Sequence, residues 1–252
     1  MWVAWAIMRV TVVVPTYNEA DNIETLVRAV RQVLPQALVL VVDDGSPDGT
    51  ADKAEKLGIM LGQVDVVRRT SKDGLGAAYR AGLRAAISGG AEICVQMDAD
   101  LSHDPAALPA LVAIVEHGAD LAIGSRYVPG GITLNWPRRR HFVSRWGNRY
   151  AAGVLGLAVN DATAGYRAYR SEVLERMQFE SVEAEGYGFQ IEMTYRIVRL
   201  GGKVVEFPIT FRDRMEGVSK FNGSIVREAL LLVVRLWVAD FGGRRRRRAQ
   251  GG

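Results

Sequence analysis

Three aspartates stand close together near the middle of the chain, in the stretch MDADLSHDP at residues 97–105. The stretch ends an apolar run that is typical of a buried strand. Alternate side chains of an extended segment leave it on the same side, so Asp98 and Asp100 could together hold one hard divalent cation. Asp104 differs, because aspartate directly before Pro105 is a favoured N-terminal cap of a helix. The pattern predicts an Mg²⁺ or Mn²⁺ site and, after it, a helix start.

Other kinds of chemistry agree less well with the residues. An EF-hand calcium loop would need glycine and glutamate where this stretch has His103 and Pro109. The histidines and Cys94 lack the spacing of a zinc site, and we expect Cys94 to be a small buried apolar side chain. Gly74 and Gly76 do not match a dinucleotide fingerprint. They either let the backbone pass close to a nucleotide or begin a helix.

The elements that must position the aspartates alternate along the first half of the chain. Apolar, strand-like runs occupy residues 10–14, 38–42, 64–67, 92–97 and 120–124. Helix-like segments occupy residues 20–34, 48–57, 74–88 and 105–117. Continuous apolar strands joined by helices imply a mostly parallel sheet covered on both faces, and ligands of such sheets bind beyond the carboxyl ends of the strands. Acids, a tyrosine and an arginine follow four of the strands, which predicts one shared site.

The pattern changes after Tyr127. A loop rich in Gly, Trp and Arg contains the cluster Arg138–Arg140, which is either solvated or meets an anion. Helices are expected at 142–157 and 188–200, with a strand at 204–211. The apolar segment 225–239 would be about 22 Å long as a helix, short of the ~30 Å hydrocarbon core of a bilayer. We expect it to lie on a membrane or dock on a partner.

The composition is that of an ordinary globular domain of 252 residues, with 48% hydrophobic and 24% charged residues. The net charge is +4, but five basic residues are the terminal run Arg244–Arg248, so a nucleic-acid partner is not expected. A single cysteine is typical of a reducing compartment, and the short apolar N-terminus is a poor signal peptide. These features favour a cytoplasmic protein.

Five stretches, in this order, resemble the polyprenol monophosphate mannose synthases, the dolichol-phosphate mannose synthase group of family 2 glycosyltransferases. They are PTYNEADNI, VVDDGSPDGT, MDADLSHDP, GSRYVPGG and DRMEGVSKF, and they extend from about Val10 to Phe221. The resemblance implies an α/β fold of the GT-A (Rossmann-like) type, with a mostly parallel central sheet and a C-terminal interfacial helical segment. It implies a catalytic domain at 1–221 and an attachment segment, with an apolar helix and an Arg-rich tail, at 222–252.

The resemblance also implies a reaction. Mannose would pass from GDP-mannose to a polyprenyl phosphate with inversion, giving polyprenyl β-mannosyl phosphate, with Mg²⁺ or Mn²⁺ as cofactor. The implied donor-binding residues are Pro15, Tyr17, Glu19, Val42, Asp43, Asp44, Asp98, Ala99, Asp100, Arg214 and Lys220. The implied metal ligands are Asp98, Asp100 and, more weakly, Ser102. The implied acceptor-phosphate residues are Arg126, Arg140 and Ser144. The implied catalytic residues are Asp98, Asp100, Arg126, Arg214 and Lys220.

Two other functions stay open at this point. One is a polyprenyl-phosphate glucosyltransferase that uses UDP-glucose, and the other is a non-catalytic sugar-nucleotide-binding or scaffold protein. The chain resembles the short members of the group, so we expect a peripheral protein at the cytoplasmic face of the membrane, with a separate integral-membrane partner. The segment GYGFQIEM also matches the group, but neither Gln190 nor Glu192 receives a chemical step.

Overall fold

The computed structural model describes residues 8–213 and 227–239. At its centre is a seven-stranded sheet with the strand order β3-β2-β1-β4-β7-β5-β8. The strands are β1 (Val10–Thr16), β2 (Leu38–Asp43), β3 (Val64–Arg68), β4 (Ile93–Gln96), β5 (Leu121–Ser125), β7 (Arg167–Arg170) and β8 (Val204–Pro208). Neighbouring strands are parallel except at β7, which runs antiparallel between β4 and β5. The predicted α/β class with a mostly parallel sheet is confirmed.

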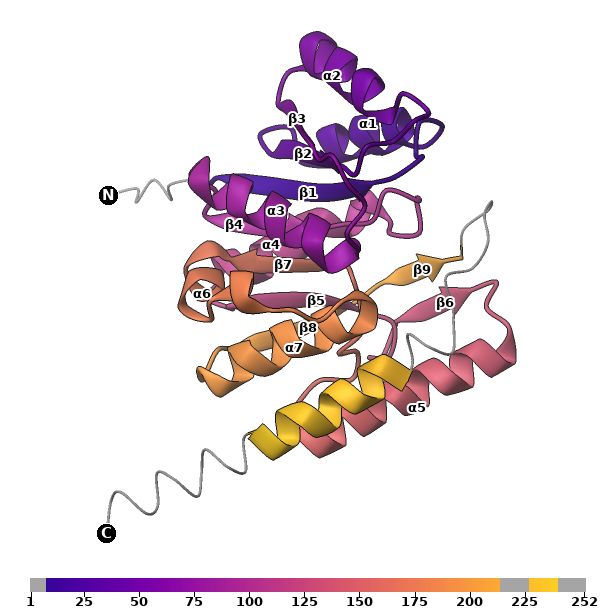
Figure 1. The fold of residues 1–252 in the computed structure, drawn as a ribbon, viewed down its shortest axis with the longest axis vertical. Helices are drawn as coiled ribbons and strands as arrows, with labels where there is room; N and C mark the ends of the chain where they lie inside the picture. Colours follow the sequence, from indigo (N-terminus) through magenta and orange to yellow (C-terminus); the bar gives the residue numbers. More distant parts are fainter. Residues whose placement is uncertain (1–7, 214–226, 240–252) are drawn as a thin grey trace.

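Helices cover both faces of this sheet (Figure 1). Side chains alternate along β1, so Val12 and Val14 face one core and Val13 faces the other. One face carries α1 (Ile23–Val33), α2 (Thr50–Leu61), the 3₁₀ turn η1 (Pro105–Ala107) and α4 (Leu108–Glu116). The other face carries α3 (Leu75–Ser88), α6 (Ser171–Arg176), η2 (Phe179–Ser181) and α7 (Gly186–Arg199). Burial on both faces explains why the strands read as continuous apolar runs.

Two further helices lie on the side of α7 (Figure 1). They are α5 (Arg138–Leu155) and the helix of residues 227–239, which together line one pocket. Ala229 and Val233 of the second helix are buried, whereas Leu231 and Val238 are 63% and 56% exposed. A small parallel sheet of β6 (Ile132–Leu134) and β9 (Thr210–Arg212) lies beside the start of α5. Within the described ranges, every helix is too short or too polar to span a lipid bilayer.

Two differences from the predicted boundaries concern the site directly. α5 begins at Arg138, so the Arg138–Arg140 cluster forms the first turn of a helix instead of a loop. β4 ends at Gln96, and Asp98 and Asp100 therefore lie in a bend beyond the strand. The alternation of side chains along a strand does not relate these two aspartates, although they still lie at the carboxyl end of β4.

Other differences concern short elements. The predicted strand 204–211 is two strands, β8 and β9, which pair with different partners on either side of Ile209. β6, β7 and α6 were not predicted, because segments of three to six residues carry too little periodicity. The apolar segment predicted at 225–239 is described as helix from Arg227 onward. The terminal run Arg244–Arg248 lies outside the described residues.

Candidate active site

The two aspartates of the predicted metal site are held in place by buried neighbours. The hydroxyl of Tyr79 donates a hydrogen bond of 2.8 Å to Oδ1 of Asp98. The backbone N–H of Asp98 donates to Nδ1 of His103 at 3.2 Å, and the other ring nitrogen lies 4.0 Å from Oδ2 of Asp98. Oδ1 of Asp100 accepts the backbone N–H of Ser102 at 3.1 Å. Tyr79 and His103 are buried, so Asp98 is anchored from the interior.

The electrostatics keep both anchors in their neutral forms. Burial, followed by the charge of Asp98, raises the pKa of Tyr79 well above its ordinary value of 10.0, so the hydroxyl remains a donor. Burial lowers the pKa of His103 below its ordinary 6.5 despite the attraction of Asp98. Because Nδ1 of His103 accepts a backbone N–H, its ring proton belongs on Nε2, the nitrogen that faces Asp98.

The residues at this bend suit a cation that keeps open positions. Within the described ranges, no group of three or more His, Cys, Asp and Glu side chains is gathered to hold a metal ion alone. The hydroxyl of Ser102 is buried and has no hydrogen-bond partner among the described residues. Two carboxylates and one unpaired hydroxyl form a partial oxygen donor set, which leaves positions for water or phosphate oxygens. The residues present therefore fit the predicted divalent cation.

The carboxyl ends of β1 and β2 lie next to this bend, because β1 pairs with both β2 and β4. Asp43 is buried and accepts hydrogen bonds from Thr16 Oγ1 at 3.0 Å and from Ser46 N–H at 2.8 Å. The neighbouring Asp44 forms an ion pair with Arg69. Burial raises the pKa of Asp44 above its ordinary value in spite of that arginine. Asp43 thus holds the loop after β2.

The remaining predicted donor residues divide into buried and accessible positions. Val42 and Ala99 are buried, with 0% and 3% of their surface exposed. Tyr17 is 37% exposed, and Nζ of Lys72 lies 3.5 Å from the centroid of its ring. Glu19 accepts a hydrogen bond from Asn22 at 2.9 Å. Pro15 pairs in register with Val42. The structure brings these residues together at the ends of β1, β2 and β4.

Arg126 follows β5 and is buried in an ion pair. Its Nε and Nη2 donate to the carboxylate of Asp161 at 2.7 and 2.6 Å, and Nη2 also donates to Thr163 Oγ1 at 2.9 Å. Burial lowers the pKa of Arg126, but the charge of Asp161 outweighs it and raises that pKa overall. For Asp161 the effects are reversed. Burial raises its pKa, but the charge of Arg126 outweighs burial and holds the pKa below its ordinary value. Both groups stay charged at neutral pH.

The loop of residues 160–165 connects this ion pair to the aspartates. Glu206 of β8 accepts the backbone N–H of Asp161 at 2.9 Å and so fixes the loop. At the other end of the loop, a Cβ on Gly165 would lie 3.6 Å from Oδ2 of Asp98. Thr163, between them, bonds Arg126 and the side chain of Asn148 in α5. One short loop therefore adjoins the predicted metal site, Arg126 and α5.

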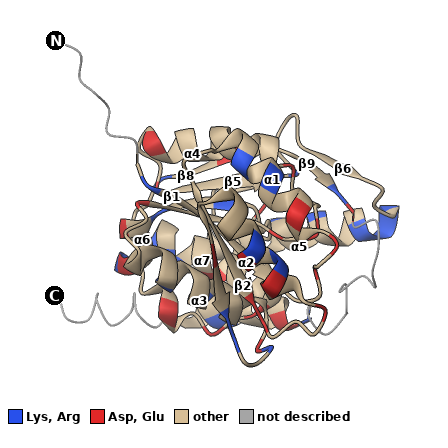
Figure 2. Cartoon of the chain, turned by 90° about the horizontal axis from the view of Figure 1, so that it is seen from above, with Lys and Arg blue, Asp and Glu red and all other residues tan. Residues whose placement is uncertain are grey.

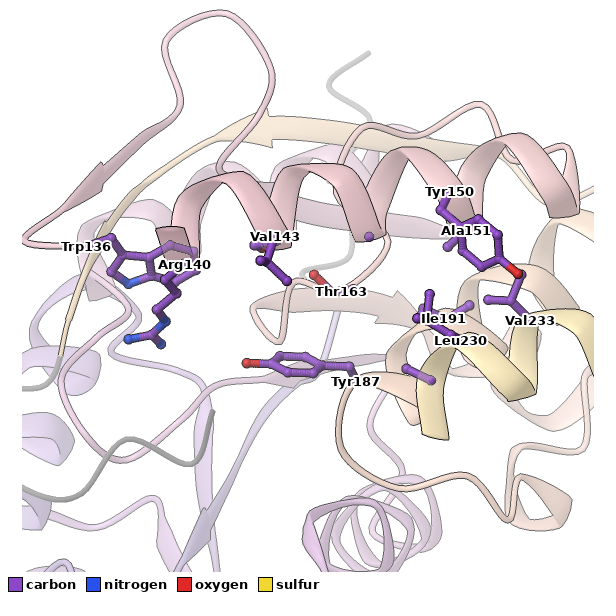
Figure 3. A pocket seen from close by; sticks show the side chains of 13 residues that line it. Trp136, Arg140, Val143, Tyr150, Ala151, Thr163, Tyr187, Ile191, Leu230 and Val233 are labelled. Atoms are coloured by element: carbon purple, nitrogen blue, oxygen red, sulfur yellow. The ribbon is translucent and has the colours of Figure 1, made fainter. Parts of the chain in front are cut away.

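A small pocket, with a cavity volume of about 50 Å³, lies between α5, the start of α7 and the helix of residues 227–239 (Figure 3). Its apolar lining is Val143, Ala151, Ile191, Ala229, Leu230 and Val233. Its polar lining includes Arg140, Ser144, Thr163 and Tyr187. In Figure 3, Trp136 and Arg140 lie at one end, and Tyr150 and Val233 lie at the other. The pocket is thus polar at one end and apolar at the other.

The predicted acceptor residues meet at the polar end. Nη1 of Arg140 lies 2.8 Å from both carboxylate oxygens of Asp213, and the hydroxyl of Tyr127 donates to Oγ of Ser144 at 2.7 Å. Figure 2 shows basic residues, in blue, at the end of α5 that follows β6. Arg126 adjoins this end of the pocket through Thr163, which lines it. Three predicted phosphate-binding residues are therefore close to one another.

The sequence did not predict several residues of the site, and some predicted residues lie outside the described ones. Arg214 and Lys220 are in the second group. The missed residues are Tyr79, His103, Trp136, Asp161 and Thr163. The first two stand in motifs already singled out, but nothing in the sequence says that Tyr79 reaches Asp98. Asp161 contacts Arg126 across 35 positions of the chain, and no local pattern signals such a pair.

Gly74 and Gly76 have a local explanation. Gly74 adopts a φ of +102° just before α3, and a Cβ on Gly76 would lie 2.8 Å from the carbonyl oxygen of Ala184. The backbone N–H of Gly76 donates to Glu185 at 2.7 Å. The glycines thus begin a helix and make room for Glu185, which agrees with the simpler of their two predicted roles.

Comparison with known proteins gives one family. A family model described as glycosyl transferase family 2 matches residues 11–178. The polyprenol monophosphomannose synthase of Mycolicibacterium smegmatis is 51% identical over 226 residues, which is 89% of this chain and 85% of that protein. The undecaprenyl-phosphate mannosyltransferase of Micrococcus luteus is 48% identical over 232 residues, 92% of this chain and 95% of that protein.

Solved structures share the fold at lower identity. Glucosyl-3-phosphoglycerate synthase from Mycobacterium tuberculosis, in complex with Mn²⁺, UDP-glucose and phosphoglyceric acid, has a TM-score of 0.69 and 22% identity, over 91% of this chain and 80% of its own. A mannosyltransferase from Pyrobaculum calidifontis, in complex with GDP-Man and Mn²⁺, has a TM-score of 0.58 and 19% identity, over 97% of this chain and 76% of its own.

Proposed function

The chain belongs to glycosyl transferase family 2, and from this premise we propose that it transfers mannose from GDP-mannose to a polyprenyl phosphate, with inversion. The observation that carries the proposal is the pocket near the Asp98 bend, which has a polar end with Arg140 and an apolar end. A lipid phosphate combines these two properties in one molecule. The high identity to two polyprenol-phosphate mannosyltransferases over most of the chain supports the same substrate class.

GDP-mannose is the proposed donor. A mannosyltransferase of similar fold was solved with GDP-Man and Mn²⁺. In this chain the nucleotide would lie at the ends of β1, β2 and β4, against Tyr17, Glu19 and Asp44 and the backbone of Val42 and Ala99. Asp98, Asp100 and the Ser102 hydroxyl would hold Mg²⁺ or Mn²⁺. When bound, such a cation neutralises charge that develops on the leaving diphosphate.

The acceptor would enter the pocket with its phosphate at the polar end. Arg140 and Ser144 would bind the phosphate oxygens, and the buried charge of Arg126 would act from behind Thr163. The prenyl chain would lie along Val143, Ile191 and their apolar neighbours in the pocket. This orientation points the phosphate towards the loop of residues 160–165 and therefore towards the metal site.

The reaction needs no strong general base. A phosphate monoester has a second pKa near ~6, so the acceptor is largely deprotonated at neutral pH. Direct attack of a phosphate oxygen on the sugar inverts the anomeric centre. Arg214 and Lys220 stay proposed as the residues that neutralise the leaving diphosphate, together with the cation. A carboxamide substitution that abolishes turnover while sparing metal and donor binding would contradict this account.

Attachment to a membrane surface is part of the proposal. The helix of residues 227–239 exposes Leu231, Val234, Trp237 and Val238. Apolar burial together with a basic cluster such as Arg244–Arg248 is a known route to interfacial binding of anionic lipid. Residues 222–252 would form an attachment segment at the cytoplasmic face, beside an integral-membrane partner, and residues 1–221 the catalytic domain.

The test is transfer of radiolabelled mannose from GDP-mannose to a polyprenyl phosphate, with Mg²⁺ or Mn²⁺ and with UDP-glucose in parallel. We expect a metal-dependent mannolipid that the Asp98→Ala/Asp100→Ala variant does not make. Reaction with UDP-glucose alone would overturn the donor and favour a polyprenyl-phosphate glucosyltransferase. If neither donor reacts even with added membranes, a sugar-nucleotide-binding or scaffold protein becomes the better account.

A further inference from the structure

We propose that Trp136 binds the acceptor phosphate, by donating its indole N–H to a phosphate oxygen beside Nε–H of Arg140. Trp136 stands just before α5 and lines the pocket at the same end as Arg140 (Figure 3). The inference rests on the proposed function for the identity of the ligand, a phosphate that carries a prenyl chain. It adds a phosphate-binding side chain that the sequence motifs do not point to.

Two unpaired donors at one end of the pocket are the first observation. Nε1 of Trp136 and Nε of Arg140 are both buried, and neither has a hydrogen-bond partner among residues 8–213 and 227–239. A buried donor without an acceptor is unfavourable, and most buried polar groups in folded proteins are paired. Two such donors on neighbouring side chains that line one pocket indicate that a ligand supplies the acceptor atoms.

The charge around the start of α5 is the second observation. Pro137 is the N-cap of this 18-residue helix and gives no side-chain cap, and the first turn contains no acidic residue. That turn instead contains Arg138, Arg139 and Arg140. Cations are unfavourable at a helix N-terminus, where the helix dipole is positive, whereas an anion is favourable. Asp213 pairs with Arg140, but the turn itself carries three cations and no acid, so an anion is favourable beside it.

The surroundings of the indole ring are the third observation. The guanidinium carbons of Arg126 and Arg140 lie 5.3 and 4.2 Å from its centroid. Phe211 packs edge-on against it, with ring centroids 5.5 Å apart at 74°. These contacts use the faces and packing surface of the ring and fix its orientation, but they do not use its N–H. The donor is thus held in one direction before any ligand binds, which lowers the entropic penalty of binding.

The shape of the pocket favours a lipid phosphate over free phosphate. From Trp136 and Arg140 the pocket continues towards apolar side chains of α5, α7 and the helix of residues 227–239. Free phosphate would use only the polar end. A prenyl phosphate would also cover apolar surface, which is favourable in proportion to its area.

The experiment compares Trp136→Phe with Trp146→Phe. Phenylalanine keeps an aromatic ring beside the arginines but removes the N–H. Trp146 lies on α5, is 49% exposed, stacks on Tyr150 and does not line the pocket, so its substitution is a matched control. The probes are farnesyl phosphate, uncharged farnesol and inorganic phosphate, with binding measured by titration calorimetry. Circular dichroism and the melting temperature report whether each variant is folded.

We expect Trp136→Phe to weaken farnesyl phosphate binding about tenfold, the size typical of a hydrogen bond to a charged group. Farnesol binding should not change, and the control should behave as wild type. In turnover, KM for the acceptor should rise by the same factor, with kcat and KM for GDP-mannose unchanged. Arg140→Lys keeps the charge but removes the second donor, so it should weaken the same binding even if Trp136→Phe does not fold.

Unchanged affinity for farnesyl phosphate in Trp136→Phe, or in Arg140→Lys if the first variant does not fold, would overturn the inference. An equal loss of farnesol binding would also overturn it, because the role would then be packing alone. Equal wild-type affinity for inorganic and farnesyl phosphate would overturn the lipid assignment. Binding of farnesyl phosphate that depends on Trp136, without any mannose transfer, would reject the proposed function and leave the inference standing.

Discussion

At the scale of single residues, the ion pair of Arg126 and Asp161 is the strongest constraint near the site. Its side chains are 6% and 0% exposed. Removal of one partner leaves the other charge buried without compensation, so Asp161→Asn should destabilise the fold by about 3–5 kcal/mol. Urea unfolding measures this loss. Asp52→Asn, which breaks an exposed ion pair with Arg68, is the control and should have no measurable effect.

The same pair predicts a dependence of stability on pH. Burial raises the pKa of Asp161, but Arg126 outweighs it and holds that pKa below the ordinary 3.8. A lowered folded-state pKa contributes stability that is complete above about pH 3.8 and is lost as the pH falls through the folded value. Wild type should therefore lose stability more steeply than Asp161→Asn below this pH. Parallel slopes in urea unfolding between about pH 2 and 6 would contradict the assignment.

Cys94 is predicted to be unreactive in the native state. It is fully buried, as expected from the sequence, and burial raises the pKa of its thiol to about 11 against a weaker effect of Ser171. Only the thiolate reacts rapidly with alkylating agents. We expect no labelling by iodoacetamide at pH 8 within the time in which the urea-unfolded chain is labelled completely. Mass spectrometry of the intact protein distinguishes the two outcomes.

At the scale of elements, α3 packs unusually close to the sheet. A Cβ on Gly82 would lie 2.3 Å from Val13 and 2.7 Å from Val42, on two strands that carry proposed donor residues. Gly82→Ala should therefore destabilise the protein by about 1–3 kcal/mol through overpacking. Gly153 in α5 has no atom within 4 Å of the corresponding position, so Gly153→Ala should stabilise by about 0.5–1 kcal/mol. Opposite shifts in urea unfolding would support this packing.

The length and periodicity of each element explain which elements the sequence predicts. Long helices and apolar strands were found because their periodicity is strong, and their positions brought Pro15, Asp44 and Asp98 to one edge of the sheet. The start of α5 was misplaced because arginines in a first turn oppose the usual charge preference. Contacts such as Tyr79 with Asp98 depend on how α3 packs against β4, and no pattern within either segment reveals them.

At the scale of the whole molecule, one side combines the pocket with an exposed apolar face. Leu231 and Val238 are 63% and 56% exposed, and burial of a leucine side chain is worth about 1.5–3 kcal/mol. Leu231→Glu/Val238→Glu should therefore weaken binding to anionic vesicles at least about tenfold in sedimentation. Ile59→Glu, at a site on α2 that is 87% exposed, should bind as wild type. An equal loss in both variants would discard this face as the attachment surface.

The antiparallel strand β7 also bears on how the protein is made. β4 and β5 leave the ribosome before β7, yet β7 lies between them in the sheet. Roughly 40 residues separate β5 from β7, which is about 2–8 s of synthesis at ordinary rates. During that interval the nascent chain can assemble β1 to β4, which carry the proposed donor residues, while β5 has no neighbouring strand. β7 then joins the two parts into one sheet, and α7, β8 and the helix of residues 227–239, which complete the sheet and the pocket, follow it.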